Sequence, residues 1–450
     1  MTSDDTTLDA SAPRLEVDTL LDDPRTRIVV CCGSGGVGKT TTAAALGVRA
    51  AERGRKVVVL TIDPARRLAQ SMGISELDNV PRRVKGVDEA AGGELHAMML
   101  DMKRTFDEIV EGHADADRAR AILENPFYQS LSAGFAGTQE YMAMEKLGQL
   151  RANDEWDLIV VDTPPSRSAL DFLDAPKRLG SFLDGKFIRV LMAPAKVGGR
   201  AGMKFLNVGM SMMTGTLSKL MGGQLLRDVQ TFVAAMDTMF GGFRTRADAT
   251  YRLLQAPGTA FLVVAAPERD ALREAAYFVE RLAAEQMPLA GLVLNRVHGS
   301  GAAQLSAERA LAAAETLGEG LPEDDGTDDV ATGVHTENNL EPTGIVDLDA
   351  GKDAVGTVGG LSPAAAADPA APTSASAAQL AAGLLRLHAE RMQVLARERR
   401  TRDRFTALHP EVPVTEVAAL PGDVHDLAGL RAIGDRLALD DTTTDRDTDD

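Results

Sequence analysis

Gly33-Ser34-Gly35-Gly36-Val37-Gly38-Lys39-Thr40 fits the pattern G-x-x-x-x-G-K-[ST] of a phosphate-binding loop. An apolar run (RIVVCCG, 27–33) precedes the loop and a helical pattern over 39–53 follows it, which is the context that the motif requires. Glycines let the backbone curl so that successive N–H groups face phosphate oxygens, and the helix N-terminus adds positive potential. We therefore expect a nucleotide, ATP, to be bound by Gly33, Ser34, Gly35, Gly36, Val37, Gly38, Lys39, Thr40 and Thr41.

Individual roles within this loop follow from side-chain chemistry. Lys39 is expected to reach the β- and γ-phosphates as a catalytic charge, the Thr40 hydroxyl to ligate Mg²⁺, and Thr41 to bond the α-phosphate. A second apolar run, LIVVD (158–162), ends in Asp162, whose carboxylate is expected to hold the metal through water. The alternative is a glycine-rich turn that matches by chance, and it explains neither the flanking elements nor Asp162.

Asp63 is a second catalytic candidate. It ends the apolar run 56–63, within Thr61-Ile62-Asp63-Pro64-Ala65-Arg66. A carboxylate at the carboxyl edge of a parallel sheet lies where nucleotides bind in open α/β folds, and from there it could orient the attacking water. The alternative role is structural, with Asp63 as the N-cap of a helix that has proline at its first position.

Strand and helix patterns alternate along the chain, which is typical of an α/β fold. Most of the expected strands are continuous apolar runs, as in parallel strands that are covered on both faces. We predict a P-loop NTPase with a mostly parallel central sheet flanked by helices. The expected strands are 27–33, 56–63, 95–101, 156–162, 259–266, 289–297 and 412–420, and the expected helices include 39–53, 138–151, 268–287, 302–317 and 378–406.

One ATPase domain is predicted over 27–437, interrupted twice. Residues 176–256 are predicted to form a helical subdomain rich in methionine and glycine, whose flexible side chains suit a surface that accepts apolar partners. An ordinary helical core is the alternative. Residues 317–377 are predicted to be a disordered acidic insertion, and 1–26 and 438–450 to be disordered acidic ends. The methionines concerned are Met192, Met203, Met210, Met212, Met213, Met221, Met236 and Met239.

Charge and cysteine content limit the partners and the compartment. Of the formal net charge of −18, the segments 1–26, 317–377 and 439–450 carry −21, so the remainder is near +3 and gives no support for a nucleic-acid partner. No apolar run is long enough to cross a bilayer, so at most peripheral membrane association is expected. Cys31 and Cys32 are the only cysteines, which favours a reducing cytoplasm.

Five motifs together resemble the arsenite-pump and tail-anchored-protein-targeting ATPases, a family with a deviant Walker A loop. The resemblance implies that Asp63 positions the hydrolytic water, that Asn295 reads the adenine, and that Leu420 and Pro421 pack near the base. It also implies a dimer that closes around two nucleotides. The motifs are GSGGVGKTT (33–41), TIDPARRLAQSMGI (61–74), VVDTPPS (160–166), VLNRV (293–297) and AALPGDVHDL (418–427).

The chain departs from this family at three places. Ser34 replaces the signature lysine that reaches phosphate across the dimer, so the chain is either slow by itself or paired with a paralogue that retains the lysine. Arg66 and Arg67 stand in the first switch segment, where eukaryotic relatives carry His-Asn, and Arg167 replaces a glycine in the second. The homodimer and the heterodimer both remain open.

The resemblance implies an ATP-driven switch that binds an apolar, membrane-protein-like client or an anion-transport-type partner. Arsenite binding needs several converging thiolates, and an inter-subunit zinc needs a C-x-x-C pair, so neither is expected here. One alternative is a regulatory subunit that binds nucleotide but hydrolyses it little, which Ser34 supports. Another is a septum- or plasmid-positioning ATPase, but the acidic tail lacks the membrane helix or basic surface that such a protein needs.

Overall fold

The computed structural model describes residues 13–62, 66–74, 77–131, 138–164, 242, 245–319 and 374–438. It divides into two compact units, of which the first comprises Met1–Gly299 with Leu395–Asp450 and the second Ser300–Val394. The single ATPase domain expected over 27–437 stays a prediction, and only residues 300–319 and 374–394 of the second unit are described.

The first unit is built on an eight-stranded sheet in the order β3-β4-β2-β5-β1-β6-β7-β8. All neighbouring strands are parallel except the short edge pair β3–β4. The predicted α/β class with a mostly parallel sheet is therefore confirmed, and all seven expected strands are present. The strands are β1 (Ile28–Cys32), β2 (Lys56–Thr61), β3 (Arg82–Arg83), β4 (Glu94–Met99), β5 (Leu158–Asp162), β6 (Thr259–Ala265), β7 (Leu289–Val297) and β8 (Val414–Ala418).

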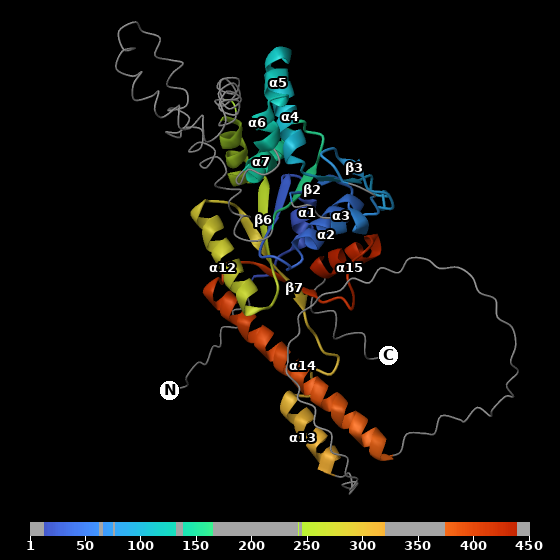
Figure 1. Cartoon of the computed structure of the whole chain (residues 1–450). Coiled ribbons are helices and arrows are strands. Elements are labelled where there is room, and N and C mark those ends of the chain that lie inside the picture. Colours follow the sequence, from blue (N-terminus) through green and yellow to red (C-terminus); the bar gives the residue numbers. More distant parts are fainter. Residues whose placement is uncertain are drawn as a thin grey trace, which may run out of the picture. The chain divides into compact units, whose positions relative to one another are not determined.

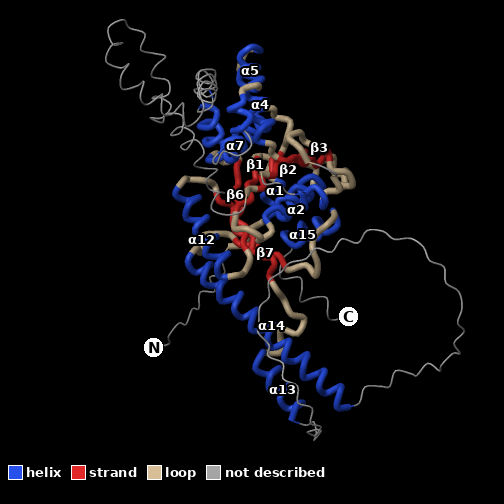
Figure 2. Tube along the Cα trace, in the orientation of Figure 1, coloured by secondary structure: helices blue, strands red, loops and turns tan. Residues whose placement is uncertain are grey.

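Helices cover both faces of this sheet, which is why its central strands are apolar throughout. Every residue of β1, β5 and β6 is buried. Side chains alternate between faces, so Val29 and Cys31 join one core cluster while Val30 and Cys32 join the other. Figures 1 and 2 show the strands between the two helical layers. The first layer contains α1 (Val17–Asp22), α2 (Lys39–Glu52) and α15 (Leu427–Ala438), and the second α7 (Thr138–Ala152) and α12 (Arg269–Ala284).

The N-terminal segment corrects one prediction, because residues 13–26 are not disordered. Helix α1 buries Val17 and Leu21 against the core, and its acidic residues face α2. The Asp18 carboxylate accepts a hydrogen bond from Arg49 Nε at 2.6 Å, and this bond lowers the pKa of Asp18. The acidic composition that suggested disorder therefore serves an ion-paired helix interface. Residues 1–12 lie outside the described part of the chain.

Three helices between β4 and α7 were not predicted: α4 (Met102–His113), α5 (Ala116–Leu123) and α6 (Pro126–Leu131). Their capping residues are a sequence signal that could have revealed them. Asp101 accepts a hydrogen bond from the Arg104 backbone N–H, and Asp115 accepts one from the Arg118 backbone N–H, both at 2.9 Å. Aspartate at the N-cap is a standard start of a helix.

The second unit contains α13 (Ala307–Glu319) and the first part of α14 (Ser374–Leu408). His388 Nε2 lies 2.8 Å from the Leu305 carbonyl oxygen within this unit. Both helices extend slightly into the segment 317–377 that was predicted to be disordered, and residues 320–373 lie outside the described chain.

The methionine-rich segment 176–256 is described only at 242 and from 245 onward, where 245–255 are helical. All eight of its methionines lie outside the described residues, so its role as a helical subdomain stays a prediction. Among the helices that the structure describes, none is both long and apolar enough to cross a membrane.

Candidate nucleotide-binding site

The glycine-rich loop lies at the carboxyl end of β1, the strand that runs between β5 and β6. The chain moves from β1 to β2 and β4 on one side, and later continues through β6, β7 and β8 on the other. In open α/β sheets, this reversal of strand order is where ligands bind, beyond the carboxyl ends of the strands. The sequence motif and the topology therefore identify the same edge of the sheet.

Glycine is required in this loop for two separate reasons. Gly36 has φ +76° and Gly38 has φ +94°, a region that residues with a side chain rarely adopt. Close approach adds to this, since a Cβ atom on Gly33 would lie 2.1 Å from the Val264 carbonyl oxygen, and one on Gly38 would lie 2.3 Å from Asn295 Nδ2. The backbone of the loop is thus fitted tightly against β6 and β7.

Gly33→Ala is expected to destabilise the protein by about 3 kcal/mol, because its Cβ would push into the backbone of a buried central strand. Gly36→Ala is the matched control, with positive φ but no atom within 4 Å of the added Cβ, and should cost only about 1–2 kcal/mol. Urea unfolding of both variants measures the difference. Equal losses would show that backbone conformation, and not contact with Val264, determines the requirement at position 33.

Lys39 and the start of α2 make the inside of the loop suitable for phosphate. The Lys39 side chain is buried, and its Nζ donates to the Ser34 carbonyl oxygen across the loop at 2.7 Å. Gly38 is the N-cap of α2 and offers no side chain to cap the helix, and the start of a helix is a favourable place for an anion. The Ser34 hydroxyl is buried and has no hydrogen-bond partner among the described residues. A phosphate group would satisfy these donors.

Asp162 lies beside the loop at the end of β5. Its carboxylate is fully buried and accepts hydrogen bonds from Thr40 Oγ1 at 2.7 Å and Thr61 Oγ1 at 3.0 Å. The register places Asp162 next to Cys31 of β1 and Thr61 of β2. A hydroxyl and a carboxylate oxygen are ligands that Mg²⁺ prefers, so Thr40 and Asp162 fit the metal site expected from the sequence.

Thr61 was not identified from the sequence as a site residue. A usable signal was present, since Thr61 is the one hydroxyl residue in the buried part of β2, at its carboxyl end.

Asn295 on β7 contacts the loop directly. Its Nδ2 donates to the Val37 carbonyl oxygen at 2.8 Å, and its Oδ1 accepts from the Arg296 backbone N–H at 3.0 Å. The structure thus gives Asn295 a role in holding the phosphate loop, while its role in reading adenine stays a prediction.

Leu420 and Pro421 follow β8, whose Val417 pairs with Asn295 of β7. Leu420 packs at the margin of the core on the α2 side, and Pro421 is exposed. Their place at the same edge of the sheet as the loop is compatible with the predicted contact with the base, which remains a prediction.

Asp63 and Arg167 lie outside the described residues, and the side chains of Arg66 and Arg67 are not described either. The residue that precedes Asp63, Ile62, is described. The Ile62 backbone N–H donates to the Asp162 carbonyl oxygen at 3.1 Å, and the Ile62 carbonyl accepts from Gln139 Nε2 at 2.9 Å. Gln139, on α7, was not identified from the sequence.

The two cysteines behave as core residues. Both are buried, and burial raises the pKa of each thiol, that of Cys32 to about 12. At neutral pH both are therefore protonated thiols that pack in the core at the end of β1, next to the phosphate loop.

Comparison with known proteins agrees with this geometry. A family model described as anion-transporting ATPase matches residues 26–311. The chain is 30% identical over 171 residues to ATPase GET3 of Malassezia globosa, covering 38% of this chain and 48% of that protein. It is 25% identical over 306 residues to ATPase GET3 of Podospora anserina, and this match covers 67% of this chain and 82% of that protein. It is 23% identical over 286 residues to ATPase ASNA1 homolog 2 of Paramecium tetraurelia, covering 62% and 78%.

The match to the Malassezia protein thus spans about half the length of that relative. The family model, in contrast, covers well over half of this chain and includes the glycine-rich loop, Asp162 and Asn295. The resemblance inferred from the motifs is confirmed: the chain belongs to the anion-transporting ATPase family.

Proposed function

We propose that this chain hydrolyses ATP to ADP and phosphate in a Mg²⁺-dependent reaction. The observation that carries the proposal is the arrangement of Lys39 inside the loop with the Thr40–Asp162 pair beside it. A buried ammonium group, the uncapped start of α2 and two oxygen ligands for a hard cation occupy one edge of the sheet. Phosphoryl transfer depends mainly on such positioned charge.

Each residue has a separate task in this proposal. Lys39 neutralises charge on the transferred phosphoryl group, and Thr40 with Asp162 would hold Mg²⁺, which supplies further neutralisation of phosphate oxygens. Asp63 orients the attacking water. Asn295 keeps the loop in register through its bond to Val37.

We further propose that hydrolysis drives a dimeric switch. Binding and release of nucleotide would change the affinity for an apolar client or for an anion-transport-type partner. Family membership supports this proposal, as does the methionine-rich composition of 176–256. The dimer is either a homodimer or a heterodimer with a paralogue that supplies the lysine missing at Ser34.

A second candidate function is that of a nucleotide-binding regulatory subunit with little hydrolysis of its own. Ser34 favours it, because a buried serine hydroxyl at this position offers no positive charge to a partner's site. The two functions differ in whether a lysine at position 34 is enough to restore hydrolysis.

Ser34→Lys is expected to raise the steady-state rate of Mg-ATP hydrolysis by roughly 10-fold or more, because it restores a cation near the transferred phosphate. Ser34→Ala is the matched control and should leave the rate near that of the unaltered chain, and Asp63→Asn provides the inactive baseline. If all variants bind ATP but none hydrolyses it above that baseline, the regulatory function is correct. If the unaltered chain is already fast and Ser34→Lys changes nothing, no lysine from a partner is needed.

A further inference from the structure

The backbone just before Asp63 is held at both of its polar atoms. Ile62 is almost fully buried; its N–H donates to Asp162 on β5, and its carbonyl accepts from Gln139 on α7. The Ile62 carbonyl belongs to the planar peptide group that joins Ile62 to Asp63. The two hydrogen bonds therefore hold the last described backbone group before Asp63.

Gln139 makes this contact across a long sequence separation. It is the second residue of α7, yet its side chain donates to the residue that follows β2 and does not bond the N–H groups of its own helix. The simple alternative is that Gln139 only fills space where α7 approaches β2. The 2.9 Å bond to a main-chain oxygen makes a more specific contact than packing requires.

Helix α7 is itself firmly anchored by buried polar contacts. Lys146, about two turns beyond Gln139, pairs with Glu108 of α4 at 3.0 Å. Glu145 pairs with Arg246 at 2.6 Å and accepts a hydrogen bond from the Tyr141 hydroxyl at 3.0 Å. Lys146, Glu145 and Tyr141 are all buried, so these contacts resist displacement of the helix. Gln139 therefore lies on a helix that is held in place by several buried polar contacts.

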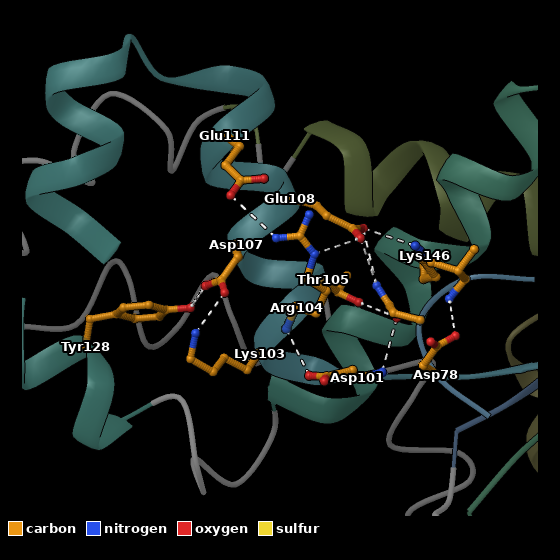
Figure 3. A network of polar contacts seen from close by, with 12 residues as sticks. Asp78, Asp101, Lys103, Arg104, Thr105, Asp107, Glu108, Glu111, Tyr128 and Lys146 are labelled. Carbon is orange, nitrogen blue, oxygen red and sulfur yellow. Dashed lines mark hydrogen bonds and ion pairs between the residues drawn. The ribbon is translucent and has the colours of Figure 1, made fainter. Parts of the chain in front are cut away.

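Helix α7 is also connected, through Glu108 of α4, to the part of the chain that follows the segment containing Asp63. Glu108, the partner of Lys146, accepts a hydrogen bond from the buried Asn79 amide at 3.2 Å. Asn79 Oδ1 in turn accepts from Thr105 Oγ1 and from the Asp101 backbone N–H, both at 3.1 Å. Figure 3 shows Glu108 extending from α4 toward Lys146, with Thr105 and Asp101 on the adjoining turns. The chain before Asp63 and the chain after α3 (Arg66–Ser71) are therefore both connected to α7.

We propose that Gln139 is a positioning residue for the hydrolytic step, acting on Asp63 through the Ile62 carbonyl. This inference rests on the proposed ATP hydrolysis and on the water-orienting role of Asp63. A group that orients an attacking water must be held within a fraction of an ångström, because small displacements reduce the rate steeply. In the proposed function, nucleotide binding depends instead on the loop and on Lys39, whereas the Gln139 side chain donates to the Ile62 carbonyl.

Gln139→Ala and Gln139→Glu are the variants to test, with Gln149→Ala on the same helix as the matched control. The glutamate variant keeps the size of the side chain but, when ionised, cannot donate to the carbonyl. Both Gln139 variants are expected to lower kcat about 10-fold and to leave KM and the Kd for ATP within about twofold. Gln149→Ala should leave all three unchanged. A rise in KM that accounts for the loss, or an equal loss in Gln149→Ala, overturns the inference.

A double-mutant cycle with Asp63→Asn separates positioning from a general structural effect. Single-turnover hydrolysis of radiolabelled ATP with excess protein measures the slow variants. If Gln139 acts through Asp63, Gln139→Ala has no further effect in the Asp63→Asn background. The same fold-loss in both backgrounds overturns the inference.

The cycle also distinguishes this inference from the function on which it rests. If Asp63→Asn is inactive while Gln139→Ala equals the unaltered chain, only the inference fails. If the unaltered chain does not hydrolyse ATP, or if Asp63→Asn is fully active, the corresponding part of the proposed function fails and the inference falls with it.

Discussion

Lys39→Ala is expected to lower kcat for Mg-ATP hydrolysis by on the order of 100- to 1000-fold, the loss that follows removal of one well-placed charge donor from a transition state. The ammonium group is buried within the loop and donates to the Ser34 carbonyl oxygen at 2.7 Å, so its charge lies inside the loop that we propose binds phosphate. Without the Lys39 ammonium group, the negative charge that develops on the transferred phosphoryl group is no longer neutralised by this side chain.

Lys56→Ala is the matched control for this experiment. Lys56 begins β2 at the opposite edge of the sheet, where its ammonium group pairs with Glu155 at 3.3 Å. Steady-state hydrolysis and calorimetric titration with ATP should separate the two variants, while circular dichroism verifies that both are folded. Wild-type hydrolysis by Lys39→Ala would remove the main argument that this loop is catalytic.

The sheet and the phosphate loop could be predicted from sequence because their signals are local. β1, β5 and β6 are buried on both faces, so each is a continuous apolar run that is visible without knowledge of its neighbours. The glycines of the loop are required by backbone angles and close contacts, which again restrict the sequence position by position. The Thr40–Asp162 pair followed from the motif together with the end of an apolar strand.

Other parts of the site depend on contacts between distant segments, and these left little trace in the sequence. Gln139 is an ordinary polar residue near the start of a helix, and only the packing of α7 against β2 gives it a partner at Ile62. Asn295 was assigned to the base through family resemblance, whereas its observed contact is with Val37.

Composition was misleading at the N-terminus. The acidic residues of α1 looked like those of a disordered end until Arg49 of α2 was seen to pair with Asp18. The edge strand β3 is only two exposed arginines long and has no apolar pattern to detect.

Asp162→Asn is expected to reduce hydrolysis about 100-fold and to raise the Mg²⁺ concentration needed for half-maximal activity, with little effect on folding. Asparagine retains an oxygen that can accept hydrogen bonds from Thr40 and Thr61, so the buried contacts at 2.7 and 3.0 Å keep an acceptor. What is lost is the negative charge that would hold the cation beside the phosphates.

The control for Asp162→Asn is Asp157→Asn, immediately before the other end of the same strand, where the carboxylate accepts from the Lys56 backbone N–H. Magnesium titrations of the hydrolysis rate, together with thermal melting, compare the two variants with the unaltered chain. A normal magnesium dependence in Asp162→Asn would mean that Asp162 only orients Thr40 and Thr61. If Asp162→Asn needs a higher Mg²⁺ concentration but melts at the normal temperature, the negative charge at the end of β5 is needed to bind the metal. The reason is that this variant keeps the hydrogen bonds to Thr40 and Thr61 and loses only the charge.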